Sequence, residues 1–374
     1  MQTLAQVFDT KRSSNRLLRT LLAVLALGVA VASDLQHLLF VYPFGVDLEI
    51  PLRAAERWRS GGAAYLASAF ASPPGATQPF LYPPYVLPPL SLLVDLPRMA
   101  VLAAWCLVCV AAFAFIGRRL AFPLWAWPLL LLWPPILEPI IGGNVQLPVV
   151  AMFCAVFWTS PSGSARPFEP QERELSEPGA TGPGIGVLAA LSGSIKVSQP
   201  HTWLAVLRRR PRIALIGALA VAIAAALTLP FTGISVWADW LDQLRRATAP
   251  TWDLGGFAIA RLVNPALGLI VSVISICVLL AFLPRRHTGA WVGVLAVVGA
   301  TSLHSFGVLF LLPGMLLARR ELSLVAAMLI ATTTYEGTWA GILVIAGALV
   351  LSIKWPQTLE PPLGGQVATD RIPR

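Results

Sequence analysis

Residues 17–33 have the sequence LLRTLLAVLALGVAVAS, and residues 324–353 have the sequence LVAAMLIATTTYEGTWAGILVIAGALVLSI. Both runs are apolar over a length close to the roughly 20 residues that a helix needs to cross the hydrocarbon core of a membrane. Similar runs lie between them. Of the 374 residues, 56% are hydrophobic and 12% are charged, whereas about a quarter of a soluble domain is charged. The sequence therefore predicts an integral membrane protein.

The pattern predicts helices rather than a transmembrane β-barrel, because the short alternating polar and apolar segments of a barrel do not occur. The 32 prolines and 29 glycines indicate that several helices are broken. The first run lacks a small-residue cleavage site, so we interpret it as a retained span rather than a signal peptide. The expected fold class is all-α and polytopic.

The formal net charge of +9 reflects membrane topology, as the positions of the basic residues indicate. Arginines gather in short clusters between apolar runs: Arg118–Arg119, Arg208–Arg210 with Arg212, Arg285–Arg286 and Arg319–Arg320. Such clusters follow the positive-inside rule, by which basic loops remain in the cytoplasm. We therefore expect a multi-pass protein of the cell membrane, with both termini in the cytoplasm, membrane lipids around it and no nucleic acid as partner.

The charge rule also sets the predicted order of spans. A single transmembrane domain covers 1–354, with a long extracytoplasmic loop at 39–97, a flexible cytoplasmic loop at 160–184 and a disordered cytoplasmic tail at 355–374. Within the first loop, 83–96 is expected to be a helix in the membrane interface. The predicted spans are 17–38, 98–117, 120–140, 144–159, 213–231, 262–283, 289–303, 305–318, 322–335 and 337–353, with a hairpin of two half-length runs, 185–195 and 197–207, joined at Lys196, and a second outer loop from 232 to about 256.

Polar side chains within or beside apolar sequence are costly in a membrane and are therefore functional candidates. On the predicted topology, one set falls on the extracytoplasmic face: Asp47, Glu49, Tyr82, Asn144, Gln146, Lys196, Arg261 and His304. Acids and cations on one face suit a reaction at an anionic lipid headgroup. Cations hold its phosphate, and a carboxylate takes the proton of an attacking hydroxyl.

No metal site is predicted. The four cysteines lie in apolar runs without metal-ligand spacing, so we interpret them as small buried hydrophobic residues. No glycine-rich nucleotide-binding loop is visible either.

Five motifs, in this order, resemble glycosyltransferase family 87, whose members are C-fold, polyprenyl-phosphate-sugar-dependent transferases. The resemblance runs from about residue 40 to 320, with Leu303 in place of the family's proline and Gln146 in place of its second asparagine. The motifs are Asp47 with Ala54-Ala55 and Tyr65, Tyr82-Pro83-Pro84 with Pro89, GGNVQLPVV at 142–150, SIKVSQP at 194–200 and SLHSFGVLFLLP at 302–313.

The apolar runs and charges predict about 11 transmembrane helices, and the resemblance implies a C-type glycosyltransferase fold. It implies transfer, with inversion, of a hexose or pentose, mannose first among them, from a polyprenyl-phosphate donor to a hydroxyl of a lipid or glycan on the extracytoplasmic face. Asp47 matches the presumed catalytic base. The departing phosphate would be stabilised by Lys196, Arg261 and His304, while Glu49, Tyr82, Asn144 and Gln146 complete the substrate-binding set. Beyond the lipid-linked donor, no cofactor is expected.

Each candidate also has a structural interpretation. Asp47 is suited to cap an amphipathic helix, and Lys196 to reach the interface along its aliphatic stem. His304 and Arg261 suit a satisfied position in the core, and Asn144 and Gln146 suit helix caps at a tight turn. At the level of function, a polytopic transporter or lipid flippase remains open, although the internal repeat expected of one is not visible. A catalytically inactive relative is the other alternative.

Overall fold

We describe the protein from a computed structural model. It describes scattered positions between 21 and 36, and residues 44–70, 78–124, 126–159, 172, 173, 175, 182–197, 199–247, 256–318 and 320–354. Most of the predicted first span and of the loop at 160–184, and the whole predicted tail at 355–374, lie outside these residues. Within them the chain is helical, and its β structure is limited to two isolated bridges, Trp158–Glu172 and Gly256–Leu303.

Three helices of the described part are long and apolar enough to cross a membrane: α4 (Arg98–Arg119), α10 (Pro211–Ala247), and Tyr335–Ser352 within α16 (Tyr335–Lys354). The expectation of an all-helical protein with apolar membrane-length helices is confirmed over the described residues. The number of about 11 spans and the C-type fold remain predictions.

The other helices follow the predicted runs closely at most places. The hairpin around Lys196 is formed as expected, by one helix that ends at Ile195 and another that starts at His201. The set comprises α5 (Ala126–Leu131), α6 (Pro134–Gly142), α7 (Gln146–Phe157), α8 (Pro183–Ile195), α9 (His201–Arg209), α11 (Ile259–Leu262), α12 (Pro265–Phe282), α13 (Thr288–Val298), η3 (Ser305–Leu311), α14 (Leu312–Leu317) and α15 (Arg320–Ala331).

The predicted span at 120–140 is broken into two short helices, α5 and α6. Pro134 and Pro135 follow Trp133 and start α6, where the missing N–H of a proline costs nothing. Trp133 is buried, and its Nε1 donates to the carbonyl of Ala327 at 3.1 Å. The break thus fixes this short helix pair against α15.

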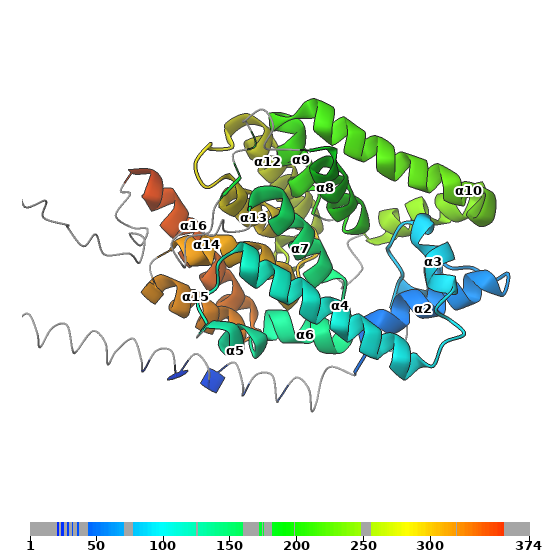
Figure 1. Cartoon of the computed structure of the whole chain (residues 1–374), viewed down its shortest axis with the longest axis horizontal. Coiled ribbons are helices and arrows are strands. Elements are labelled where there is room, and N and C mark those ends of the chain that lie inside the picture. Colours follow the sequence, from blue (N-terminus) through cyan, green and yellow to red (C-terminus); the bar gives the residue numbers. More distant parts are fainter. Residues whose placement is uncertain are drawn as a thin grey trace, which may run out of the picture.

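The second predicted outer loop, which began at 232, is also wrong in its first part. α10 continues to Ala247 and bends at Gly233, whose φ of 75° and ψ of 158° are not helical. Figure 1 shows the second half of α10 folded back below the first. The Nε1 of Trp240 in this half donates to the carbonyl of Leu81 at 3.0 Å. The bend therefore brings the end of α10 onto the first loop.

The predicted interfacial helix at 83–96 is shorter than expected. A 3-10 turn, η2 (Pro84–Val86), leads into α3 (Leu87–Ser91), and turns replace the helix from Leu92 onward. Four prolines in this stretch remove backbone donors, which limits helix length. The segment is instead fixed by side chains: the hydroxyl groups of Tyr85 and Ser194 are hydrogen-bonded at 2.7 Å, which ties η2 to α8.

Close backbone contacts hold the bundle together. A Cβ at Gly186 of α8 would lie 2.0 Å from the carbonyl oxygen of Ile213, and one at Gly217 of α10 would lie 2.0 Å from that of Gly186. Only glycine permits this approach, which is the usual way in which membrane helices gain contact area. α7 lies in the middle of the bundle (Figure 1), and its Phe153 packs against Phe310 of η3 at 4.9 Å between ring centroids.

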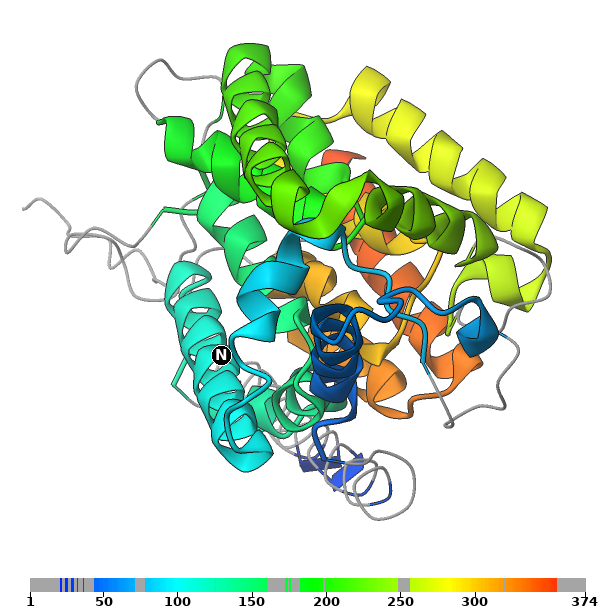
Figure 2. The same cartoon turned by 90° about the vertical axis from the view of Figure 1, so that its right-hand side faces the viewer.

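Helix α2 (Val46–Arg59) explains why so many charges gather at 44–66. Asp47 and Glu49 lie in its first turn, and Arg57 and Arg59 in its last, where each sign complements the helix dipole. One ion pair lies within α2, Arg53–Glu49 at 2.9 Å. Two others join α2 to its neighbours, Arg59–Asp95 at 2.5 Å and Arg98–Glu56 at 3.1 Å. Figure 2 shows α2 at the centre of this end of the molecule, between α4 and the second half of α10.

Candidate active site

Asp47 is placed by the turn that starts α2. Gly45 adopts a left-handed conformation with a φ of 79°, and its N–H donates to the carbonyl of Ile141 at 2.9 Å. This bond fixes the start of α2 on the end of α6. Pro51, four residues after Asp47, has no N–H to offer the Asp47 carbonyl, so that turn of the helix is not closed in the ordinary way. Asp47 itself is half-buried.

The turn between α6 and α7 meets α2 at this point. Gly143 has a φ of 77°, and a Cβ there would lie 2.6 Å from the Cβ of Leu48, so this close approach requires glycine. The next residue, Asn144, is buried, and its Nδ2 donates to Oδ2 of Asp47 at 2.7 Å. Its Oδ1 accepts from the backbone N–H of Gln146 at 2.9 Å. Asn144 thus holds the Asp47 carboxylate and caps α7 at the same time.

Lys196 completes the set from the hairpin between α8 and α9. Its Nζ donates to Oε1 of Gln146, which is fully buried, and lies 4.8 Å from the ring centroid of Phe306. Burial lowers the pKa of the Lys196 ammonium to about 8, although the negative charge of Asp47 opposes this shift. We call Asp47, Asn144, Gln146 and Lys196 the Asp47 cluster. In this cluster, Asn144 and Gln146 connect the carboxylate of Asp47 to the ammonium group of Lys196.

Tyr82 lies beside this cluster. Burial raises the pKa of its phenol, and the charge of Asp47 raises it further, which places the two groups within electrostatic reach. The carbonyl of Tyr82 accepts from the hydroxyl of Tyr65 at 2.7 Å. The first loop therefore folds back on itself and presents Tyr82 toward Asp47.

His304 belongs to the same region through its neighbour Phe306. The two rings stack with centroids 5.4 Å apart and an interplanar angle of 28°. Gly256 lies against this segment, since a Cβ at Gly256 would be 2.9 Å from Nδ1 of His304. His304 and Lys196 thus both contact the ring of Phe306.

Two residues near the cluster were not predicted. Glu138 in α6 is 7% exposed, accepts a hydrogen bond from the hydroxyl of Ser305 and interacts electrostatically with Asp47. A lone acid in the apolar stretch PPILEPII, residues 134–141, is the sequence signal that points to it. Gln199 is 1% exposed, and both its amide atoms lack a hydrogen-bond partner within the described part of the chain. The sequence signal that points to Gln199 is its position in the hairpin, three residues after Lys196.

The remaining two predicted residues are Glu49 and Arg261. Glu49 pairs with Arg53 at 2.9 Å and lies 3.8 Å from Arg98, on the outer surface of α2. Arg261 falls in α11, and its side chain lies outside the described residues. Within those residues, no three side chains of His, Cys, Asp and Glu are grouped as a metal site requires. The expectations of no metal and no further cofactor stay predictions.

Over its described residues the chain combines helices of membrane-crossing length with a hydrogen-bonded acid–amide–cation cluster, which indicates a membrane protein with a polar functional site. The family model of glycosyltransferase family 87 matches residues 80–264. This match covers just under half of the chain and supports the resemblance to this family of glycosyltransferases. The matched range contains Tyr82, Asn144, Gln146 and Lys196, whereas Asp47 and His304 lie outside it. No curated protein and no solved structure matches the chain.

Proposed function

We propose that the protein transfers a hexose or pentose, with mannose as the first candidate, from a polyprenyl-phosphate donor to a hydroxyl group of a lipid or glycan. The reaction would take place on the extracytoplasmic face of the cell membrane and invert the anomeric configuration. The observation that carries this proposal is the chain of contacts from Asp47 through Asn144 and Gln146 to Lys196, because it pairs a base with a cation.

Asp47 is the proposed general base. It takes the proton of the acceptor hydroxyl while the hydroxyl oxygen forms a bond to the anomeric carbon of the sugar. Asn144 orients the Asp47 carboxylate through its hydrogen bond to Oδ2. Attack from the side opposite to the leaving phosphate inverts the sugar. Both products stay close to the lipid–water boundary, where an amphipathic donor is held by its polyprenyl chain.

Lys196 is the proposed partner of the leaving group. When the bond between the anomeric carbon and the phosphate oxygen breaks, a phosphodiester with one negative charge becomes a phosphomonoester with a second. A fixed cation in a poorly hydrated site stabilises charge that develops in this way. The Nε2 of the buried Gln146 has no hydrogen-bond partner among the described residues, and it supplies a further donor for the phosphate. His304 and Arg261 are weaker candidates for the same role.

Further residues near the Asp47 cluster are candidates for contacts with the substrates. Tyr82 and Gln199 border the cluster and suit hydrogen bonds to sugar or acceptor hydroxyl groups. Glu49, held by Arg53, suits a role in orienting the acceptor at the mouth of the site. The chemistry needs no metal, because the cationic partner of the phosphate comes from Lys196.

The test is a transfer assay with the purified protein in lipid nanodiscs and total lipid of the host as acceptor. Radiolabelled polyprenyl-phosphate mannose, glucose and arabinose are supplied in parallel, with nucleotide-linked mannose as the matched control donor. We expect label in a lipid or glycan product from a polyprenyl-phosphate donor alone, and an inverted linkage in that product. Transfer from the nucleotide sugar, or active transport of the label without a product, would contradict the proposal.

A further inference from the structure

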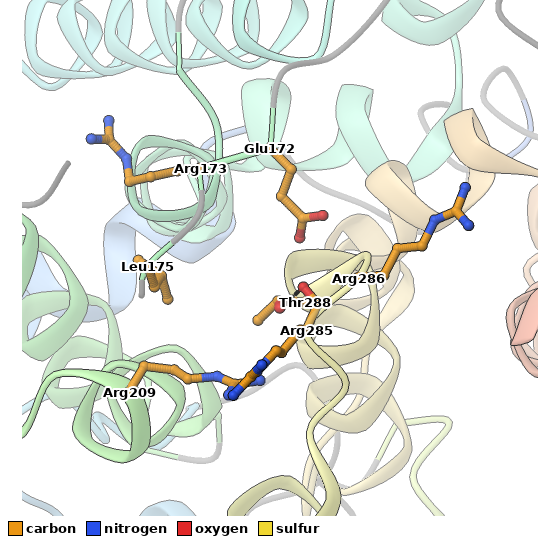
Figure 3. A pocket seen from close by; sticks show the side chains of 7 residues that line it. All are labelled: Glu172, Arg173, Leu175, Arg209, Arg285, Arg286 and Thr288. Atoms are coloured by element: carbon orange, nitrogen blue, oxygen red, sulfur yellow. Dashed lines mark hydrogen bonds between the residues drawn. The ribbon is translucent and has the colours of Figure 1, made fainter. Parts of the chain in front are cut away.

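A second polar site lies at the other end of the bundle. A cavity of about 320 Å³ is lined by Glu172, Arg173, Leu175, Arg209, Arg285, Arg286 and Thr288 (Figure 3). We call it the arginine pocket. Three separate parts of the chain contribute to it: the stretch at 172–175, the end of α9, and the residues that lead into α13.

The arginine pocket and the Asp47 cluster lie at opposite ends of the same helices, so they are separate sites. α7 begins with Gln146 in the cluster and ends at Phe157, next to Trp158, which bridges to Glu172. A helix rises about 1.5 Å per residue, so its 12 residues separate the two sites by roughly 18 Å. α8 and α9 meet near Lys196, and α9 ends at Arg209. The pocket therefore lies on the side where the predicted topology places the cytoplasm.

Three arginines of the pocket, Arg209, Arg285 and Arg286, form no ion pair with a carboxylate among the described residues. The Nη2 of Arg209 donates to the carbonyl of Leu283 at 2.8 Å, a bond that orients the side chain but leaves its charge unneutralised. Among the described residues, no salt bridge includes Arg209, Arg285 or Arg286. In Figure 3 the side chains of Arg209 and Arg285 point toward one another. Two adjacent cations repel, and an anion between them removes that cost.

Glu172, the acid among the described residues of the lining, bonds to the start of α13. Its Oε1 accepts from the backbone N–H of Gly289 at 2.6 Å, and its Oε2 lies 4.0 Å from Nδ1 of His287. It thus caps the start of α13 from a distant part of the chain. The described residues of the lining therefore place the positive charges of Arg209, Arg285 and Arg286 beside one carboxyl group that is hydrogen-bonded to α13.

We propose that the arginine pocket binds a phosphate group. The planar guanidinium groups of Arg209 and Arg285 match phosphate oxygens in two-pronged hydrogen bonds, and Arg286 at the rim adds long-range attraction. The positive-inside rule accounts for arginines on this side, but it does not require that they converge on one cavity. The phosphate belongs either to the headgroup of an anionic phospholipid at the membrane surface or to a soluble phosphate compound.

The test measures thermal unfolding of the full-length protein in nanodiscs, and its arms distinguish the two sources. One arm compares phosphatidylcholine with phosphatidylglycerol nanodiscs, and the other adds inorganic phosphate to phosphatidylcholine nanodiscs. The variants are Arg209→Gln and Arg285→Gln, with Arg245→Gln as control, because Arg245 is an exposed arginine on α10 that pairs with Asp242.

We expect the wild type and Arg245→Gln to unfold several degrees higher with one of the two phosphate sources, and both pocket variants to lose most of that gain. A gain with phosphatidylglycerol alone assigns the pocket to lipid headgroups, and a gain with inorganic phosphate assigns it to soluble phosphates. If neither source raises the midpoint, or if the pocket variants respond as the wild type does, the proposal is wrong. Arg285→Gln, on an exposed turn, keeps the test informative should Arg209→Gln fold poorly. The result does not depend on sugar transfer, so it can fail or succeed separately from the proposed function.

Discussion

The Nδ2 of Asn144 donates to Oδ2 of Asp47 across 2.7 Å, although the two residues are 97 positions apart in the chain. The bond joins the first turn of α2 to the start of α7, and Gly45 and Gly143 shape the backbone on either side of it. It orients the carboxylate of Asp47 and links this acid through Gln146 to Lys196. The proposed chemistry depends on this arrangement.

Asn144→Ala tests the positioning of the base. A hydrogen bond to a charged group contributes about 1.5–3 kcal/mol, so its loss should lower kcat by roughly 10- to 100-fold. KM for the lipid-linked donor should change by less than about twofold, because Asn144 is not proposed to bind the donor. Steady-state kinetics separate the two constants. A rise in KM with unchanged kcat would instead make Asn144 a substrate-binding residue.

Lys196→Met tests the cation. The methionine side chain keeps most of the length but removes the charge, and we expect a loss of roughly 100- to 1,000-fold in kcat. Lys196→Arg is the matched control, since it retains the charge and should recover part of the activity. If Lys196→Met transfers sugar at the rate of the wild type, the lysine only fills space next to Phe306 and Gln146.

Gly143→Ala tests the close approach of α2 to the turn before α7. An added Cβ would meet Leu48 at 2.6 Å in a backbone of positive φ, so the variant bears both strain and a clash. Gly61→Ala is the control, because Gly61 has a φ of 81° but no atom within 4 Å of an added Cβ. Strain alone costs about 1–2 kcal/mol. Thermal unfolding should show Gly143→Ala at least about 4 °C below Gly61→Ala. Equal midpoints would mean that the turn adjusts freely.

Because of Glu172, we expect the free energy of unfolding to depend on pH. Burial raises the pKa of this carboxyl from 4.5 to about 7, so the folded state favours its protonated form. Its contribution to stability is therefore complete below pH 4.5 and is lost as the pH rises through about 7. The charged groups around it are His287, Arg173, Arg285 and Arg286.

Glu172→Gln should remove this dependence. Thermal unfolding between about pH 5 and pH 8 should show a wild-type midpoint that falls, relative to the variant, by the equivalent of up to roughly 3 kcal/mol. The same slope in both proteins would assign the effect to another group, with His287 as the first to examine.

Some of the fold follows from local sequence, and other parts do not. The run at 98–117 is uninterrupted and ends in two arginines, which is why α4 matches its prediction. The hairpin at Lys196 follows from two apolar runs separated by a lysine and Pro200. The bend of α10 was missed, because tryptophans and arginines after Gly233 suggest a loop when the surface that they cover is unknown. Trp240 in fact donates to the first loop.

For the candidate site, too, some features could be predicted from the sequence and others could not. Asp47, Asn144, Gln146 and Lys196 were chosen as polar residues on one predicted face, and the structure joins them by hydrogen bonds. Their partners were not predictable, because contacts between α2, α7 and the hairpin depend on the packing of distant helices. Glu138 illustrates this, since only its bond to Ser305 reveals how a buried acid is accommodated in α6.

The most direct test compares Asp47→Asn with Glu49→Gln in a single-turnover transfer assay with the lipid-linked donor, while donor binding is measured separately. Both variants replace an acid by its amide on the same turn of α2, but only Asp47 lies in the cluster. We predict that Asp47→Asn binds the donor and loses transfer by about 100-fold or more, while Glu49→Gln stays within about threefold of the wild type. Transfer by Asp47→Asn at the wild-type rate would contradict the assignment of Asp47 as the base.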